Sequence, residues 1–307
     1  MDFRRWPWLL VSVVLSGAAS TASTAAAPAH GAAFDAAKIE ALTGAKGDFD
    51  AREGVFKIAL PRTDLAVTVA GVKLSPAMGL TSWAAFKKAG ARVMVMGDMV
   101  LLEDQVNPVM DAALDNGLAV TALHNHFLWE HPRVMFMHIE GMDAETRLAS
   151  AVGKVFAKIK ETAVGRGEAP QLDLDPAHGT LDPKKIDAVF GRSGELKNGV
   201  YKIVFGRETR MHGQTLGAAM GVNTWAAFAG SDERAVVDGD FAMHESELQA
   251  VLKALRAADI DIAAIHQHMA GETPRILFLH YWGVGSTEHL AKGIKAALAA
   301  RKPASDP

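Results

Sequence analysis

Apolar and polar residues alternate along much of the chain in a pattern that predicts strands separated by a few helices. A period of two is typical of a strand with one buried face. It predicts strands over residues 54–60, 66–74, 82–88, 91–102, 119–127 and 133–141. Apolar residues three or four positions apart predict helices over residues 34–42, 103–117 and 143–161. The first half of the chain is therefore expected to be an antiparallel sheet with helices packed on it, an α+β unit.

The same pattern occurs a second time, with matching residues at nearly constant spacing. AMGLTSWAAF at residues 77–86 aligns with AMGVNTWAAF at residues 219–228. Partners lie 147 residues apart at Lys38 and Lys185, and 142 apart at His124 and His266. Because chance similarity does not keep register along most of a copy, the chain is expected to hold two homologous α+β units, arranged as a pseudo-twofold tandem duplication.

Composition changes at both ends of the chain and between the two copies. Residues 1–31 begin with Arg4 and Arg5, continue as an apolar run and end in small residues, which is typical of a secretory signal peptide. The apolar run is shorter than the ~20 residues that span a bilayer. We expect a periplasmic or secreted protein with no membrane anchor after cleavage. The expected segments after the signal are repeat unit 1 at 32–162, a Gly-, Pro- and charge-rich linker at 163–180, repeat unit 2 at 181–301 and a disordered tail at 302–307.

Charge and cysteine content limit the partners. The net charge of −3 provides no basic surface for nucleic acid, so a small-molecule partner is expected instead. The chain has no cysteine, which excludes disulfides, lipid attachment to a cysteine and thiolate metal ligands. A metal ion would therefore bind to imidazole and oxygen. The sequence does not indicate an oligomeric state.

Histidines are concentrated in one motif that both copies share. LHNHFLWEHPRVMFMHIEG at residues 123–141 contains four of the 12 histidines and aligns with IHQHMAGETPRILFLHYWG at residues 265–283. Over the 18 positions that follow the first residue, eight are identical, and three of the eight are histidine. His131 is replaced by Thr273, so we exclude it from the candidate site. The retained candidates are His124, His126, His138, His266, His268 and His280.

Strand geometry predicts where these histidines lie. His124 and His126 are two positions apart, so they share a face at a separation of ~6.5 Å. A turn of three or five residues would place His138 across from Ala122 or a neighbouring residue, beside His124, whereas a four-residue turn would place it on the other face. We expect the odd turn and three converging histidines in each copy. Such a set suits a divalent metal ion, and zinc, iron, manganese and copper fit these residue types equally.

Acidic and basic residues recur beside the histidines. Glu130 and Glu272 complete an HxHxxxE spacing. Three roles are open for each glutamate: a fourth metal ligand, a general base on water, or a turn residue paired with arginine. That arginine would be Arg133 or Arg275, which otherwise could bind a ligand carboxylate.

Two further residue pairs recur in both copies. Asp98 and Asp240 each follow glycine and are expected in hairpin turns. Trp83 and Trp225 are expected in the core.

The duplicated motifs MG…TSWAAF, GDMVLLEDQVNPV and TALHNHFLWEHPRVMFMHIEG resemble the LppY/LpqO-type family of exported bacterial proteins and lipoproteins. The resemblance covers nearly all of the chain after residue 31. It implies export and one fold for both copies, and it implies no activity. The members that give the family its name are described as lipoproteins, whereas this chain has no cysteine to carry a lipid.

The sequence leaves three functions open. The histidine motif favours a divalent-metal or small-polar-ligand site, with metal-assisted chemistry in which Glu130 or Glu272 activates water. A non-catalytic module that binds an anionic ligand through histidine and arginine is the second. A structural protein with hydrogen-bonded, inert histidines is the third.

Overall fold

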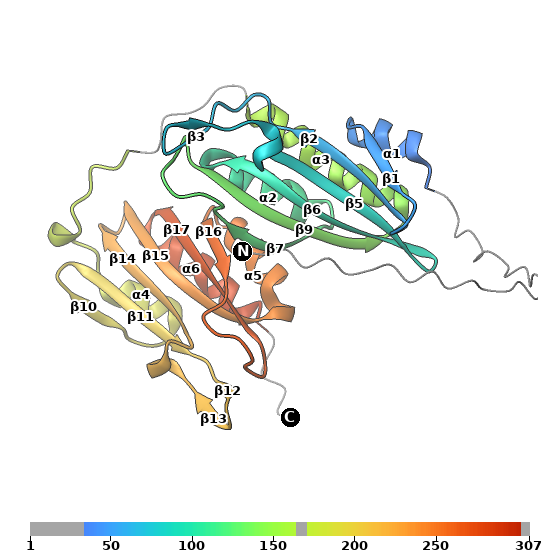
Figure 1. Cartoon of the computed structure of the whole chain (residues 1–307). Helices are drawn as coiled ribbons and strands as arrows, with labels where there is room; N and C mark the ends of the chain where they lie inside the picture. The colour runs from blue at the N-terminus through green and yellow to red at the C-terminus, as the bar shows by residue number, and fades with distance from the viewer. Residues whose placement is uncertain (1–33, 164–170, 302–307) are drawn as a thin grey trace, which may run out of the picture. The chain divides into compact units, whose positions relative to one another are not determined.

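The structure is a computed structural model that describes residues 34–163 and 171–301 (Figure 1). The predicted signal peptide, the predicted tail and part of the predicted linker lie outside the described residues. In the first repeat, six strands enter the main sheet: β1 (Gly47–Asp50), β2 (Val55–Pro61), β5 (Thr81–Ala89), β6 (Arg92–Leu102), β7 (Ala119–His124) and β9 (Val134–Asp143). Its helices are α1 (Ala36–Thr43), α2 (Val106–Asp115) and α3 (Glu145–Thr162).

The second repeat contains the equivalent elements in the same chain order. Its main-sheet strands are β10 (Glu195–Lys197), β11 (Val200–Gly206), β14 (Asn223–Gly230), β15 (Ala235–His244), β16 (Asp261–His266) and β17 (Ile276–Gly285). Its helices are α4 (Pro183–Phe190), α5 (Leu248–Arg256) and α6 (Thr287–Ala299). Short strands outside the main sheet are β3 (Thr68–Val69), β4 (Val72–Lys73), β8 (Glu130–His131), β12 (Thr209–Met211) and β13 (Gln214–Leu216).

All pairs in the main sheet are antiparallel, and its strand order shows the duplication directly. The order is β1-β2-β5-β6-β9-β7-β16-β17-β15-β14-β11-β10, so the second half gives the equivalents of the first in reverse. The two halves meet where Leu123 of β7 pairs with Ile265 of β16. This arrangement confirms the predicted α+β class and the pseudo-twofold tandem duplication.

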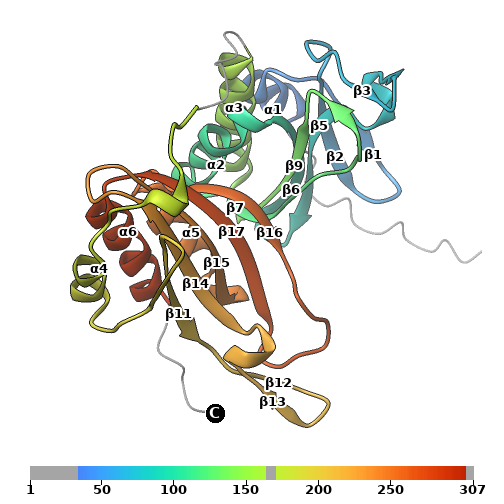
Figure 2. The ribbon, with the colours of Figure 1, turned by 90° about the vertical axis from the view of Figure 1, so that its left-hand side faces the viewer.

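One face of each half-sheet is covered by helices, and this contact forms the core. In the first repeat, α2 and α3 bury Met110, Val152 and Phe156 against strand residues such as Val95 and Ile139. Figure 2 shows α4 and α6 along one face of the second repeat's strands. Burial of this apolar surface is the main term that stabilises such a layered fold.

The opposite sheet face is covered only in part. In the first repeat, Leu65, Val67 and Leu74 lie against Val100 and Phe136 in a second, smaller apolar cluster.

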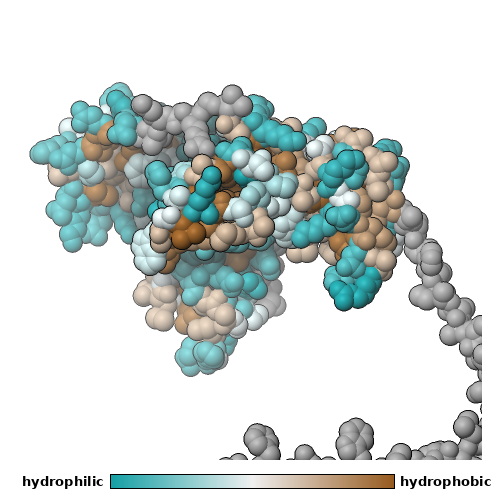
Figure 3. Space-filling view, turned by 45° about the horizontal axis from the view of Figure 1, so that its top comes forward, coloured by the Kyte–Doolittle hydropathy of each residue, from teal (hydrophilic) through white to brown (hydrophobic). Residues whose placement is uncertain are grey.

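No helix among the described residues has the length and hydropathy to cross a membrane. Figure 3 shows hydrophilic and hydrophobic residues intermixed on one face of the molecule.

The tryptophans lie on this second face, so their predicted place in the core is wrong. Trp83 and Trp225 are half-buried, and the ammonium groups of Lys57 and Lys202 lie 4.2 and 4.0 Å from their ring centroids. Ser82, the residue before Trp83, lies on the other face of β5 and is buried. Alternation identifies two faces of a strand, but it does not say which face the helices cover.

A buried ion pair joins the residue that precedes α5 to the residue that follows β11. Arg207 donates through Nη2 to Glu247 Oε1 at 3.0 Å, its Nη1 lies 2.8 Å from Oε2, and the Glu247 side chain is fully buried. His244 N also donates to Glu247 Oε2 at 2.8 Å. The equivalent residue in the first repeat is Gln105, whose Oε1 accepts from Arg62 Nη2 at 3.0 Å.

We expect Glu247→Ala to lower the free energy of unfolding by about 3–5 kcal/mol, because it leaves a largely buried guanidinium without its partner. Glu247→Gln, which copies the first repeat, should cost clearly less. The measurement is urea unfolding followed by circular dichroism. Glu245→Ala, at an exposed position of the same helical turn, is the control and should change stability by less than about 1 kcal/mol. Equal losses in the alanine and glutamine variants would contradict this interpretation.

Candidate metal centre

The predicted convergence of His124 and His138 is confirmed by strand register. Ala122 pairs with His138 across β7 and β9, and His124 pairs with Phe136. His138 therefore lies beside His124 on one face, and their Nε2 atoms are 3.1 Å apart. A β-bulge between Val120 and Ala122 sets this register for the last residues of β7.

The connection between these strands is longer than predicted. It runs over residues 125–133 rather than over a turn of three or five, and it includes β8, which pairs with β3. The parity is unchanged because nine is also odd. The longer loop is stabilised by the β3–β4 segment, a contact far apart in sequence that local pattern does not reveal.

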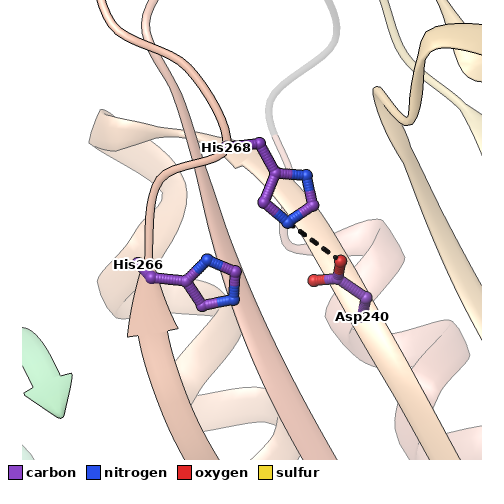
Figure 4. A group of neighbouring side chains, drawn as sticks. All are labelled: Asp240, His266 and His268. Carbon is purple, nitrogen blue, oxygen red and sulfur yellow. Dashed lines mark ion pairs between the residues drawn. The ribbon is translucent and has the colours of Figure 1, made fainter.

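In the second repeat, the matching histidines lie close together and beside an aspartate. Asp240, His266 and His268 each place one potential ligand atom within 4.8 Å of the others (Figure 4). His268 Nε2 lies 3.4 Å from Asp240 Oδ2. The rings of His266 and His280 are 4.6 Å apart between centroids, and Ala264 pairs with His280 as Ala122 pairs with His138.

Asp98 and Asp240 do not lie in hairpin turns, so that prediction is wrong. They occupy the middle of β6 and β15, directly opposite His138 and His280. The preceding glycines are needed for close packing: a Cβ on Gly97 would lie 2.7 Å from the carbonyl oxygen of Trp83. The Gly-Asp pair that both repeats share was the sequence signal for this position. In sequence alone, however, a glycine that lets a neighbouring strand approach closely cannot be distinguished from a glycine that makes a turn.

Both aspartates are buried, and each lacks a hydrogen-bond partner on one oxygen. Among the described residues, Asp98 Oδ1, Asp240 Oδ1 and His266 Nε2 are the buried side-chain polar atoms without a partner. Such atoms are rare in folded proteins because burying them unpaired costs free energy. That they occur in two equivalent aspartates points to a ligand that satisfies them.

Burial shifts the pKa values of this cluster toward the neutral forms. It raises the pKa of Asp98, against the opposing effect of nearby His138, and it raises the pKa of Asp240 to about 6. It lowers the pKa values of His126, His266 and His268. Neutral imidazoles with free nitrogen lone pairs are the form that binds metal ions.

Aromatic rings support the second histidine of each motif. His126 stacks on Phe136 and His268 stacks on Phe278, both with ring centroids 3.5 Å apart. These histidines lie two residues beyond the ends of β7 and β16, so the sheet does not fix their rings and the stacking holds them in place. Both phenylalanines are buried.

The glutamates and arginines of the motif do not join the group of Figure 4. The Glu130 side chain is 4% exposed and lies 3.8 Å from Arg133 Nε. Glu272 Oε1 accepts a hydrogen bond from Ile276 N at 3.1 Å, and Arg275 donates to Gln267 Oε1 at 3.1 Å. These contacts agree with a structural role, while ligand or base roles for Glu130 and Glu272 stay predictions.

We expect Asp240→Asn to stabilise the metal-free protein at neutral pH. The folded-state pKa of Asp240, about 6, exceeds its ordinary value of 3.8, so the folded state binds the extra proton between these two pH values. The resulting penalty is absent below pH 4 and complete above pH 6. The variant should therefore gain on the order of 2 kcal/mol in the free energy of unfolding at pH 7.5 and little at pH 4.

Urea unfolding in EDTA at the two pH values measures this difference. Glu208→Gln changes an exposed carboxylate outside this cluster and should alter stability by less than about 0.5 kcal/mol at either pH. A gain for Asp240→Asn that is the same at pH 4 and pH 7.5 would show that burial of its charge is not the cause.

Comparison with known proteins assigns the chain to a family. The profile of a family described as a domain of unknown function, DUF1259, matches residues 37–158 and again residues 184–300. No curated protein matches the chain. Among solved structures, the trimeric bacterial microcompartment shell protein PduB aligns over 83% of this chain and 89% of its own at 11% identity, with a TM-score of 0.19, too low to support an argument. The two profile matches coincide with the two repeats and cover most of the sequence, so the chain belongs to the DUF1259 family and contains its domain twice.

Proposed function

We propose that this protein binds a divalent metal ion through a histidine–aspartate site in each repeat. The observation that carries the proposal is the group of Asp240, His266 and His268, whose ligand atoms converge while an aspartate oxygen remains buried and unpaired. His280 lies opposite Asp240 and beside His266, which makes it the fourth candidate ligand. In the first repeat the corresponding group is Asp98, His124, His126 and His138.

Ligand spacing supports this proposal. Metal–nitrogen and metal–oxygen bonds of ~2.0–2.2 Å in tetrahedral geometry place neighbouring ligand atoms roughly 3.3–3.6 Å apart. His268 Nε2 and Asp240 Oδ2 are 3.4 Å apart, and His124 Nε2 and His138 Nε2 are 3.1 Å apart. Two imidazole nitrogens facing each other at this distance need only a small movement to share one ion.

Charge supports it as well. The candidate ligands of each repeat consist of three histidines and one buried carboxylate, so a divalent cation would neutralise the carboxylate and satisfy its unpaired oxygen. Zinc, iron, manganese and copper all accept this combination of nitrogen and oxygen. When bound, such an ion would act as a Lewis acid toward a small polar substrate.

We further propose that the protein acts outside the cytoplasm. The proposal rests on the signal-peptide pattern of residues 1–31 and on the resemblance of the duplicated motifs to LppY/LpqO-type exported proteins. Export also agrees with a site that uses no thiol, because histidine and carboxylate ligands tolerate an oxidising compartment.

We expect protein purified without an affinity tag to bind up to two equivalents of Zn²⁺, one per repeat, as measured by elemental analysis after dialysis. His266→Ala/His268→Ala and His124→Ala/His126→Ala should each remove about one equivalent, because each double variant deletes two ligands of one site. His178→Ala, which removes an exposed histidine outside both groups, is the control and should bind as the wild type does.

The structural alternative makes the opposite prediction. If the histidines only hydrogen-bond to one another, as the contact between His124 and His138 also permits, the wild type retains no ion. Its melting temperature would then ignore zinc, iron, manganese, copper and nickel alike. That outcome would refute the metal proposal.

Metal affinity should fall as the solution becomes acidic. The carboxyl group of Asp240, whose pKa burial raises to about 6, must lose its proton to bind the ion. We therefore expect the apparent Kd of the second repeat's site for Zn²⁺ to rise at least about tenfold between pH 7 and pH 5, by competition with a chromophoric chelator. Measuring it in His124→Ala/His126→Ala isolates that site, and an affinity unchanged over this range would rule out Asp240 as a ligand.

A further inference from the structure

A cavity of about 450 Å³ opens beside the first repeat's histidines, in the size range of small-molecule sites. Its lining includes His124, Phe127, Trp129, Glu130 and Arg133 from the first repeat. The second repeat contributes Ala263, Ala264 and His266, which reach the cavity because β16 lies next to β7. The loop of residues 125–133 thus supplies most of its apolar and charged side chains.

Trp129 has an unfavourable backbone conformation that the second repeat avoids. Its φ is +61°, a left-handed value that bulky residues rarely adopt, and its side chain is largely exposed. The matching position in the second repeat is Gly271, with a φ of +94°, which glycine adopts without strain. A tryptophan that is both strained and exposed stabilises neither the backbone nor the core, which indicates a role in contacting a ligand.

Arg133 also differs from its counterpart. Arg275 is held by a hydrogen bond to Gln267, whereas the matching residue in the first repeat, Asn125, donates to the carbonyl oxygen of Phe127 instead. Arg133 lies 3.8 Å from Glu130 and 3.9 Å from Glu103 through its Nε, distances beyond hydrogen bonding. Within the described part of the chain, its guanidinium donors therefore make no hydrogen bond.

We propose that the cavity of the first repeat binds a small organic acid with an aromatic or apolar body, and that the second repeat has no such site. Arg133 binds the carboxylate, because its planar donors match a carboxylate in two parallel hydrogen bonds. Trp129 and Phe127 cover the apolar body. The acid would then lie beside His124, and the binding itself does not depend on the proposed metal.

The nearby glutamates compete with the acid without preventing its binding. Glu103 is exposed, and its long contact with Arg133 is screened by water. The closest approach of Glu130 is to Nε, at 3.8 Å, which is beyond hydrogen bonding, so it does not take up the donors of the guanidinium. A neutral amide of the same shape offers the guanidinium one carbonyl acceptor and no charge, so it should bind more weakly than the acid.

The test uses 2-naphthoate and its neutral analogue 2-naphthamide as probes, with the full chain after EDTA treatment and again after zinc loading. We expect isothermal titration calorimetry to show naphthoate binding in both forms and at least about tenfold weaker binding of the amide. Arg133→Gln should weaken naphthoate binding at least about tenfold. Arg275→Gln, the same change in the second repeat, should leave it within about twofold of the wild type.

Trp129→Gly separates binding from folding. It places the second repeat's residue at the strained position, so its melting temperature should equal or exceed that of the wild type while naphthoate binding weakens at least about threefold. The proposal is overturned if naphthoate fails to bind in both forms, if the amide binds equally well, or if the Arg133 and Arg275 variants weaken binding equally. Because the EDTA-treated protein is included, failure here is distinguishable from failure of the metal proposal.

Discussion

Strand register is the constraint on which the candidate site depends. Asp98, His138 and Ala122 lie opposite one another on three neighbouring strands, and the same alignment joins Asp240, His280 and Ala264 in the second repeat. A slip of one residue would move each histidine to the helix-covered face. The apolar residues between them, packed against α2 and α3, hold this register, so the core indirectly positions the polar cluster on the other face.

The cluster concentrates groups that are unfavourable in the absence of a cation. A carboxylate that is buried among imidazoles with one oxygen unpaired destabilises the folded state, and apolar packing around it does not offset this cost. A buried carboxylate beside histidines is present in both repeats, which agrees with the proposed metal site in each, whereas the cavity residues differ between repeats. The proposals therefore divide the roles: a metal site in each repeat, and one ligand cavity in which Trp129 and Arg133 act.

Much of the fold was predictable from sequence because it depends on local periodicity and on the internal repeat. The parity of His124 and His138 also followed from strand geometry, since it needed only an odd connection. The tryptophans are placed wrongly because alternation does not reveal which face of a strand meets the helices. Asp98 and Asp240 are placed wrongly for another reason: a glycine that admits a neighbouring strand looks the same in sequence as a glycine in a turn. The β-bulge before Ala122 and the pairing of β8 with β3 depend on contacts distant in sequence, which a local pattern does not contain.

Anomalous X-ray diffraction from crystals of the tag-free protein grown with Zn²⁺ tests the central claim most directly, because it locates the ion among named atoms. The account predicts a zinc peak within about 2.0–2.2 Å of a carboxylate oxygen of Asp240 and of nitrogens of His266 and His268, and a second peak at Asp98 and His124. Peaks only at exposed histidines such as His178, with none in either cluster, would contradict it.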